Sequence, residues 1–213
     1  MKTTLERGAG LILPVYSLPS RWGCGTLGKE ARGFIDFLKE SGQTYWQVLP
    51  ACPTSMGDSP YSGLSAFAGN PYFIDMETLC REGLLQEWEC EQRDWGGHPA
   101  YVDYGKMYEN RYPLLRLAYS RSNHQDTPAF KEFCQSSQAW LEDYALFMAV
   151  KNHFGGACWV NWDRDIRLHE EEACRHYRSL LAEEIGFWEF LQFKFYQQWE
   201  EIRAYANEQG ILI

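Results

Sequence analysis

The sequence predicts an α/β fold with parallel strands, and two apolar runs separated by an amphipathic segment carry that prediction. Residues 10–15 (GLILPV) and 45–49 (YWQVL) are each expected to form a buried strand. Between them, four apolar residues recur at the spacing of a helix with one buried face: Ala31, Phe34, Ile35 and Leu38. Gly42 follows as the expected helix stop. A strand, a helix and a strand over this length form a right-handed βαβ unit with parallel strands.

Beyond residue 75 the sequence is expected to be mainly helical. One helix is predicted over Met76–Trp88, and another over Lys106–Tyr119, interrupted or restarted at Pro113. Thr127 is expected to cap a third helix, with Pro128 in its first turn, that stops at residues 155–156. A long last helix should bury five residues on one face and end near Gly210: Phe187, Leu191, Phe195, Trp199 and Ile202.

The last residues, Ile211–Ile213, begin a new apolar run that we expect to be the start of a third strand. A closed barrel of eight strands and eight helices needs roughly 250 residues or more. An open sheet with an apolar edge favours aggregation. We therefore expect the chain to be the N-terminal part of a larger enzyme. The alternative is a complete small α/β protein whose last strand pairs at the sheet edge.

Composition and charge exclude several classes of partner. Among the 213 residues, 20 Lys and Arg against 29 Asp and Glu give a net charge of −9, and no basic run indicates a nucleic-acid partner. The seven Cys are scattered without a C-x-x-C pair, which favours reduced thiols of a cytoplasmic protein over disulfides or a zinc site. Neither a signal peptide nor a membrane span is expected.

The loop at 57–75 (GDSPYSGLSAFAGNPYFID) says most about function. It is rich in Gly, Ser and Pro and carries Asp58 together with four aromatic rings, those of Tyr61, Phe67, Tyr72 and Phe73. Such a loop would make a poor core, but it suits a ligand that is rich in hydroxyls and partly apolar. Since glycoside chemistry needs two carboxylates, Asp58 is predicted to stabilise the loop or to bind hydroxyl groups.

Residues 23–28 (GCGTLG) match the G-x-G-x-x-G pattern of dinucleotide-binding proteins. In that fold the glycines directly follow the strand, whereas here residues 16–22 intervene. An acidic residue should also end the second strand, where this chain has Leu49 and Pro50. The pattern therefore favours a loop that needs positive φ before a helix, with a nucleotide-binding module left as an alternative.

Several long stretches, in order along nearly the whole chain, resemble one enzyme family. They are GLILPVYSLPSRWGCGTLG, FIDFLKESGQTYWQVLPACPT, GDSPYSGLSAFAGNPYFID, VDYGKMYENRYPLL, WLEDYALFMAVK and FLQFKFYQQWEEIRAYANEQGILI. The chain resembles the 4-α-glucanotransferases, also called amylomaltases or disproportionating enzymes (glycoside hydrolase family 77).

The resemblance implies the N-terminal part of a (β/α)8 barrel: the first βαβ unit and the start of the third strand, with a largely helical insertion. Residues 1–75 would hold the first strands and a substrate loop. Residues 76–186 would form the insertion, and residues 187–213 a barrel helix and the truncated third strand.

The same resemblance implies transfer of α-1,4-glucan segments between malto-oligosaccharides by a retaining mechanism, without cofactor or metal. The catalytic carboxylates are expected beyond Ile213, so no residue of this chain is assigned to catalysis. Substrate contacts are implied for Asp58, Ser59, the Pro60 backbone and Tyr61, beside the cleaved bond. At a secondary glucan site, Tyr108 matches an aromatic residue and Met56 stands where some relatives have Tyr. Trp46 and Asn70 are expected to be structural, and the oligomeric state is left open.

The competing hypothesis is a malto-oligosaccharide-binding protein without catalysis. The same aromatic loop motivates it, and the missing carboxylate pair would then be a real property of the protein.

Overall fold

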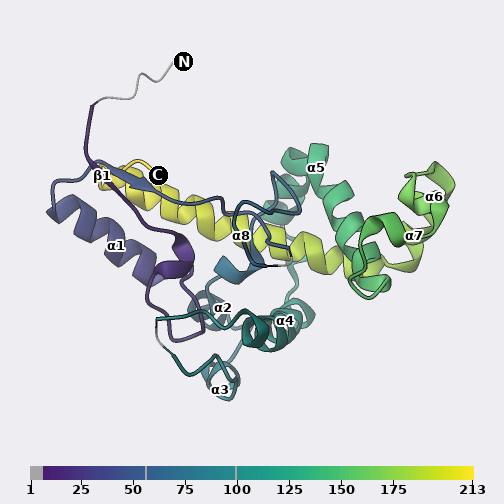
Figure 1. The fold of residues 1–213 in the computed structure, drawn as a ribbon, viewed down its shortest axis with the longest axis horizontal. Coiled ribbons are helices and arrows are strands. Elements are labelled where there is room, and N and C mark those ends of the chain that lie inside the picture. The colour runs from purple at the N-terminus through teal and green to yellow at the C-terminus, as the bar shows by residue number, and fades with distance from the viewer. Residues whose placement is uncertain (1–6, 56, 99) are drawn as a thin grey trace. The chain divides into compact units, whose positions relative to one another are not determined.

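The computed structural model describes residues 7–55, 57–98 and 100–213 (Figure 1). Met56, implied above at a secondary site, lies outside the described residues. The chain divides into two compact units, Met1–Ser120 with Lys194–Ile213, and Arg121–Phe193. The elements in chain order are β1 (Gly10–Ile12), η1 (Val15–Ser17), α1 (Lys29–Glu40), β2 (Tyr45–Gln47), η2 (Pro71–Phe73), α2 (Met76–Arg81), α3 (Glu87–Glu91), α4 (Tyr104–Arg121), η3 (His124–Asp126), α5 (Pro128–His153), η4 (Trp159–Asn161), α6 (Arg164–Arg167), α7 (Glu171–Leu180) and α8 (Ala182–Glu208), where η marks a 3-10 helix.

The sheet of the first unit is parallel, which confirms the prediction. β1 pairs with β2 so that Gly10 lies opposite Tyr45 and Ile12 opposite Gln47. Tyr45 also forms a parallel bridge with Leu212. The N–H of Leu212 donates to the Thr44 carbonyl at 2.9 Å. The apolar run at the end of the sequence therefore lies beside β2, on the side of β2 that faces away from β1. The fold is thus helix-rich α/β with a small parallel sheet.

The expectation that both strands are buried is wrong for β1. Leu11 is 39% exposed and Ile12 is 65% exposed. β1 pairs with one neighbour among the described residues, whereas β2 lies between β1 and Leu212, so the buried face centres on β2. Trp46 of β2 is 1% exposed and donates its indole N–H to the Leu13 carbonyl at 2.8 Å, which supports the structural role expected for it.

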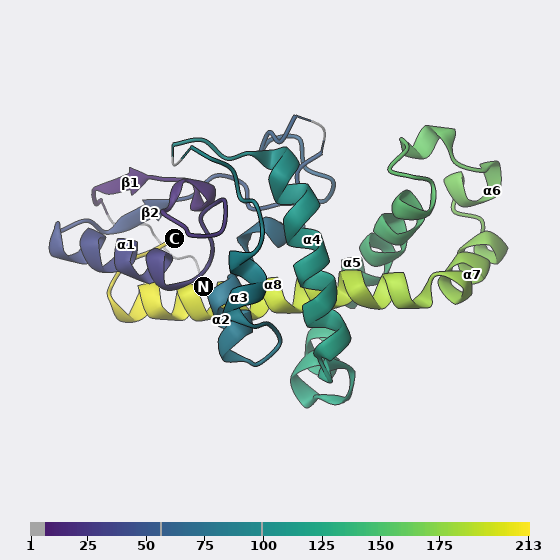
Figure 2. The ribbon, with the colours of Figure 1, turned by 90° about the horizontal axis from the view of Figure 1, so that it is seen from below.

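Helix α1 buries the predicted face and lies along the C-terminal half of α8 (Figures 1 and 2). Ala31, Ile35 and Leu38 are buried, and Gly42 follows the helix with φ +67°. On the polar side, the Tyr205 hydroxyl of α8 donates to Asp36. This pairing fixes α1 against α8 through a polar contact as well as through the apolar face.

The helices after residue 75 differ from the prediction in two places. The single helix expected over Met76–Trp88 is two short helices, α2 and α3, because Gly83 adopts φ +75° and turns the chain between them. The interruption expected at Pro113 is also wrong, since α4 continues through it. Leu114 and Leu115 just beyond it are fully buried, so packing outweighs the hydrogen bond that Pro113 cannot donate.

The second unit contains the helix predicted to start at Thr127. The Thr127 hydroxyl accepts from the Phe130 N–H at 3.3 Å, and α5 ends just before Gly155, which has φ +62°. An apolar cluster packs the end of α5 against α6 and α7: Leu146, Val150, Trp162, Ile166, Ala173, Cys174 and Tyr177. No helix in the part of the chain that the structure describes is apolar over a length sufficient to cross a bilayer.

Candidate substrate-binding site

The segment that carries four of the five predicted substrate residues is a short hairpin. Thr54 and Gly63 form an antiparallel bridge, and the Leu64 N–H donates to the Pro53 carbonyl at 2.9 Å. Near its tip Gly57 has φ +89° and Asp58 has φ +51°. Asp is one of the few residues other than glycine that tolerates this left-handed conformation. The Gly–Asp pair therefore forms the turn and places the following residues on the surface.

The hairpin's own hydrogen bonds hold the predicted residues in place. The Asp58 carboxylate accepts from the Thr54 hydroxyl at 3.4 Å, and the Ser59 hydroxyl accepts from the Tyr61 N–H at 3.3 Å. The Pro60 carbonyl accepts a hydrogen bond from the Cys52 thiol at 3.5 Å. Tyr61 is 75% exposed, so its ring is available to a ligand rather than to the core.

Tyr108 belongs to a second part of the site, a cluster of tyrosines that we call the tyrosine cluster: Tyr72, Tyr104, Tyr108 and Tyr112. The ring centroids of Tyr72 and Tyr104 lie 6.2 Å apart, and those of Tyr108 and Tyr112 lie 5.4 Å apart. The rings of Tyr72 and Tyr112, with centroids 5.9 Å apart, connect the two pairs. Tyr72 is buried at 8% exposure, while Tyr108 is 65% exposed. The cluster therefore has a buried base and one open ring.

Electrostatics connect Asp58 with this cluster. Burial, followed by the charge of Asp58, raises the pKa of the Tyr72 hydroxyl. Burial, with smaller contributions from Cys24, Tyr16 and Asp58, raises the pKa of Tyr104 to about 12. The carboxylate of Asp58 thus acts on the hydroxyls of the cluster that contains Tyr108. A carboxylate beside exposed aromatic rings can accept hydrogen bonds from sugar hydroxyls while the rings contact apolar sugar faces.

Three members of the tyrosine cluster, Tyr72, Tyr104 and Tyr112, are not among the residues predicted to bind substrate. Tyr72 is one of the four aromatic residues of the 57–75 loop, and Tyr104 and Tyr112 have no predicted role. A signal was present, because Tyr104, Tyr108 and Tyr112 recur every fourth residue and so share one face of α4. The contact of that face with Tyr72, distant in sequence, could not be seen before the fold was known.

The glycine-rich segment 23–28 is packed by the chain itself. A Cβ atom on Gly25 would lie 2.0 Å from the Val15 carbonyl oxygen, and one on Gly28 would lie 2.4 Å from the Asp75 carboxyl carbon. Gly23 has φ +87°, as expected for a loop that needs positive φ. These close approaches explain the glycines without a phosphate ligand and favour the packing interpretation over a nucleotide site.

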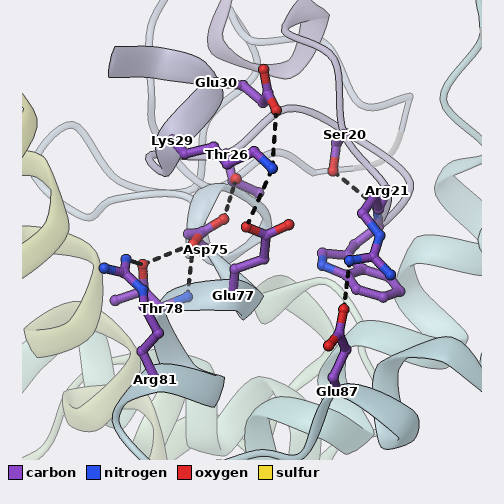
Figure 3. Close-up of polar contacts among 11 residues, drawn as sticks. Ser20, Arg21, Thr26, Lys29, Glu30, Asp75, Glu77, Thr78, Arg81 and Glu87 are labelled. Carbon is purple, nitrogen blue, oxygen red and sulfur yellow. Dashed lines mark hydrogen bonds and ion pairs between the residues drawn. The ribbon is translucent and has the colours of Figure 1, made fainter. Parts of the chain in front are cut away.

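Asp75 anchors this loop to α2 (Figure 3). One carboxylate oxygen accepts from the Thr26 hydroxyl at 2.7 Å, and the other accepts from the N–H and the hydroxyl of Thr78, both at 2.8 Å. The Asp75 N–H donates to Gln198 of α8 at 2.6 Å. Asn70, expected to be structural, caps η2 by accepting from the Tyr72 N–H at 3.0 Å. These polar groups hold the base of the tyrosine cluster.

Arg111 of α4 is the most deeply buried charge near the site. It is fully buried and donates to two carbonyls, that of Trp22 at 3.2 Å and that of Ile74. Its Nε has no hydrogen-bond partner. Burial lowers its pKa. Among the described residues, no group of three or more His, Cys, Asp or Glu side chains is arranged to hold a metal ion.

The fold and the site define a helix-rich α/β protein with a tyrosine cluster open to solvent at one ring and a hairpin that carries Asp58 and the exposed Tyr61. A family model described as 4-alpha-glucanotransferase matches residues 13–213. The chain belongs to this family.

Individual proteins of this family are similar to the chain over nearly its whole length. The chain is 45% identical to the 4-alpha-glucanotransferase of Thermus thermophilus, over 98% of this chain and 42% of that protein. It is 42% identical to that of Clostridium butyricum, over 93% of this chain and 41% of that protein. Among solved structures, the amylomaltase of Streptococcus agalactiae in complex with acarbose superposes with a TM-score of 0.91 at 40% identity, covering 97% of this chain and 42% of that one. The chain therefore spans about two fifths of the length of these relatives.

Proposed function

We propose that the chain supplies the N-terminal glucan-binding part of a 4-α-glucanotransferase. In this proposal, residues 1–75 and 187–213 contribute to a (β/α)8 barrel, and residues 76–186 form an insertion. Family membership supports the proposal, as does the parallel pairing of β1, β2 and Leu212, which is the order expected for consecutive barrel strands.

The proposed reaction transfers an α-1,4-glucan segment to the 4-hydroxyl of another glucose or glucan. A carboxylate forms a glycosyl-enzyme with retention, and a sugar hydroxyl then replaces water as acceptor. We place the catalytic carboxylates outside residues 1–213 and assign this chain to substrate binding. The alternative of a binding protein without catalysis has no support from the relatives, which are named as transferases.

The observations that carry the proposal are two exposed tyrosine rings: Tyr61 on the hairpin that holds Asp58, and Tyr108, which we propose for a secondary glucan site. Asp58 is electrostatically coupled to Tyr72 and Tyr104, and Tyr108 extends the same cluster to solvent. A malto-oligosaccharide offers alternating apolar faces and hydroxyl edges, which match exposed rings and a carboxylate. In the proposed roles, Tyr61 stacks on or hydrogen-bonds to the sugar at the cleaved bond. Asp58, Ser59 and the Pro60 backbone orient that sugar.

The proposed partners are malto-oligosaccharides and longer α-1,4-glucans, with neither nucleic acid nor membrane. Acarbose is bound by the amylomaltase of S. agalactiae, so we propose it as a further ligand. A cytoplasmic location is consistent with cysteines that are all free in the structure.

Calorimetric titration of the 213-residue chain with maltoheptaose tests the binding role. Because one stacking ring contributes about 0.5–1.5 kcal/mol, Tyr108→Ala should weaken binding about two- to thirteenfold. The matched control is Trp88→Ala, which removes an aromatic ring 55% exposed on α3 and should leave affinity unchanged. Equal affinity of the wild-type and Tyr108→Ala chains would remove the tyrosine cluster from the glucan site.

The transferase role is tested on the full-length protein with maltotriose. We expect release of glucose together with longer malto-oligosaccharides, and we expect no release by residues 1–213 alone. Absence of transfer products from the full-length protein would refute the proposed reaction, whatever the result of the titration.

A further inference from the structure

The second unit contains a surface pocket to which the proposed function assigns no role. It has a volume of about 210 Å³ and is lined by residues of α5, η4 and α6 and of the chain just after α6. All of these residues belong to the unit Arg121–Phe193, whereas the hairpin and the tyrosine cluster belong to the first unit. The pocket is therefore built by one unit alone.

One face of α5 forms a wall of the pocket. Asp143, Leu146, Phe147 and Val150 are spaced at i, i+3, i+4 and i+7, so their side chains share one face of the helix. After α5 the chain turns through two glycines at 155–156, which both have positive φ. The turn brings η4 and α6 back against this face, where they complete the pocket.

The interior of the pocket is apolar and aromatic. Its buried lining consists of four side chains: Leu146, Val150, Trp162 and Ile166. The rings of Phe147 and Trp162 have centroids 5.3 Å apart. Trp162 donates its indole N–H to the Ala157 carbonyl at 3.2 Å, which fixes the ring in the wall. Trp159, which is 50% exposed, adds an aromatic ring at the mouth.

The mouth of the pocket also carries exposed polar side chains, those of Asp143, Arg167 and His169. Oδ1 of Asp143 lies 3.4 Å from Nη2 of Arg178 and 3.7 Å from Nε2 of His169. Both contacts use Oδ1, so among the described residues Oδ2 has no protein partner and can accept from a ligand. Arg167 donates from Nη1 to the Val160 carbonyl at 2.9 Å, which leaves its other N–H groups for a ligand.

The backbone at His169 is strained. With φ +57°, it is one of two non-glycine residues of positive φ in the described chain, and the other is Asp58 of the proposed substrate hairpin. Such strained residues cluster at binding sites, where the surrounding structure holds them. The His169 N–H donates to the Ile166 carbonyl at 3.0 Å, and this turn after α6 places the imidazole at the mouth of the pocket.

The size and lining of the pocket indicate the class of ligand. A cavity of about 150 Å³ holds a benzene ring, so this slightly larger pocket suits one six-membered ring with substituents. Since the mouth presents both a carboxylate and a guanidinium, it suits a neutral ligand with donors and acceptors more than an ion. A glucose unit has this chemistry, because its C–H faces can pack on Trp159 and Trp162 while its hydroxyl groups meet Asp143 and Arg167.

We propose that this pocket binds one glucose unit of an α-1,4-glucan and is an additional carbohydrate site in the second unit. The inference rests on the proposed function, which supplies the class of ligand. A glucan held here would remain at the enzyme between transfer events, because tethering raises its effective concentration.

The test titrates the 213-residue chain, labelled with 5-fluorotryptophan, with maltose and follows fluorine NMR signals. The chain has nine Trp, so the signals of Trp159 and Trp162 are assigned from single Trp→Phe variants. We expect both signals to shift, with a dissociation constant on the order of 1 mM for a ligand of this size. The signal of Trp46, buried in the first unit, should not move.

Two substitutions measure the contributions of the mouth. Asp143→Ala should weaken maltose binding, read from the Trp162 signal, about tenfold, because hydrogen bonds to charged groups are the stronger ones. The matched control is Glu142→Ala, which removes an exposed carboxylate at the preceding position of α5, outside the pocket, and should leave binding unchanged. Trp159→Ala should weaken binding about two- to thirteenfold. Circular dichroism checks the fold of each variant.

The outcomes separate this site from the proposed function. Signals of Trp159 and Trp162 that stay fixed in maltose, while the full-length protein still produces transfer products, would overturn the site and leave the function standing. Shifts of both signals would support the site even if transfer failed. Shifts with cyclohexanol or free glucose but not with maltoheptaose would also overturn it, because the pocket would then take a small ring other than a glucan. Tyr108→Ala should preserve the maltose shifts, and their loss would assign them to the tyrosine cluster instead.

Discussion

Asp58 and Asp75 lie in the same Gly-, Ser- and Pro-rich stretch of sequence, yet the structure places them in opposite surroundings. Asp75 is 5% exposed and each of its oxygens accepts hydrogen bonds from Thr26 or Thr78. The Asp58 carboxylate accepts one long hydrogen bond from Thr54 at 3.4 Å, and Asp58 lies on the hairpin that carries Tyr61, which is 75% exposed. The first carboxylate has its acceptor capacity used by the fold, whereas the second retains capacity for a ligand.

This difference separates residues that build the site from residues that serve it. Arg111 and Asp75 organise the backbone beneath the tyrosine cluster through contacts that water cannot replace. Asp58, Tyr61 and Tyr108 contribute little to the core. Substitutions of the first group should change the free energy of unfolding, and those of the second should change ligand affinity.

The largest effect is expected for Arg111→Met. It leaves the buried carbonyls of Trp22 and Ile74 without their donor, and each buried unsatisfied group costs about 1–3 kcal/mol. Removing a buried charge offsets part of this, so we expect a loss of about 3 kcal/mol in urea unfolding. Arg93→Met, at an exposed position just after α3, should change stability by less than about 0.5 kcal/mol. Equal stability of the two variants would contradict the supporting role of Arg111.

The same substitution at the two aspartates tests the comparison directly. Asp75→Asn replaces one acceptor oxygen by an NH₂ group, which cannot accept the hydrogen bonds that Thr26 or Thr78 donates. Because this also weakens the N-terminal cap of α2, the free energy of unfolding should fall by about 2 kcal/mol. Asp58→Asn keeps a side chain that tolerates φ +51° and should stay within about 0.5 kcal/mol of wild type while lowering maltoheptaose affinity. If Asp58→Asn unfolds the chain as easily as Asp75→Asn does, Asp58 belongs to the scaffold.

Alanine substitutions at two glycines near α1 should change the stability of the chain in opposite directions. A methyl group on Gly28 would press on the Asp75 carboxylate, so Gly28→Ala should destabilise by about 1–3 kcal/mol. Gly33, inside α1, has no atom within 4 Å of an added Cβ, so Gly33→Ala should stabilise by about 0.4–1 kcal/mol. A melting temperature below wild type for Gly28→Ala and above wild type for Gly33→Ala would confirm that the glycine-rich segment 23–28 is packed by the protein itself.

Local patterns predicted the parts of the fold that depend on local chemistry. The face of α1, the stop at Gly42, the cap at Thr127 and the parallel strand pair all appear. The errors involve competition with tertiary packing. Gly83 divides an apolar stretch that otherwise suits one helix, and burial of Leu114 and Leu115 carries α4 through Pro113.

The site was predictable to a lesser extent. The sequence and its family resemblance indicated Asp58, Tyr61 and Tyr108, but the contacts of Tyr72 with the tyrosines of α4 depend on α4 lying against η2. Tyr72 and Tyr112 meet at 5.9 Å although forty positions separate them in sequence. The role of Arg111 was hidden for the same reason, since a charged residue in a helix is normally exposed.

The smallest and most specific effect is expected in alkali, where the tyrosine cluster should titrate late. Burial first, with Cys24, Tyr16 and Asp58, raises the pKa of Tyr104 to about 12 in the folded chain, against about 10 in an unfolded one. The folded state then binds the phenolic proton more tightly, so this contribution to stability is fully present below about pH 10 and is lost as the pH rises toward 12. Tyr104→Phe should therefore make the fall of unfolding free energy between pH 10 and 12 shallower, whereas Tyr101→Phe, at an exposed ring, should not. Identical slopes for both variants would show that Tyr104 ionises as freely in the folded chain as in the unfolded one, and the buried base of the cluster would then be open to water.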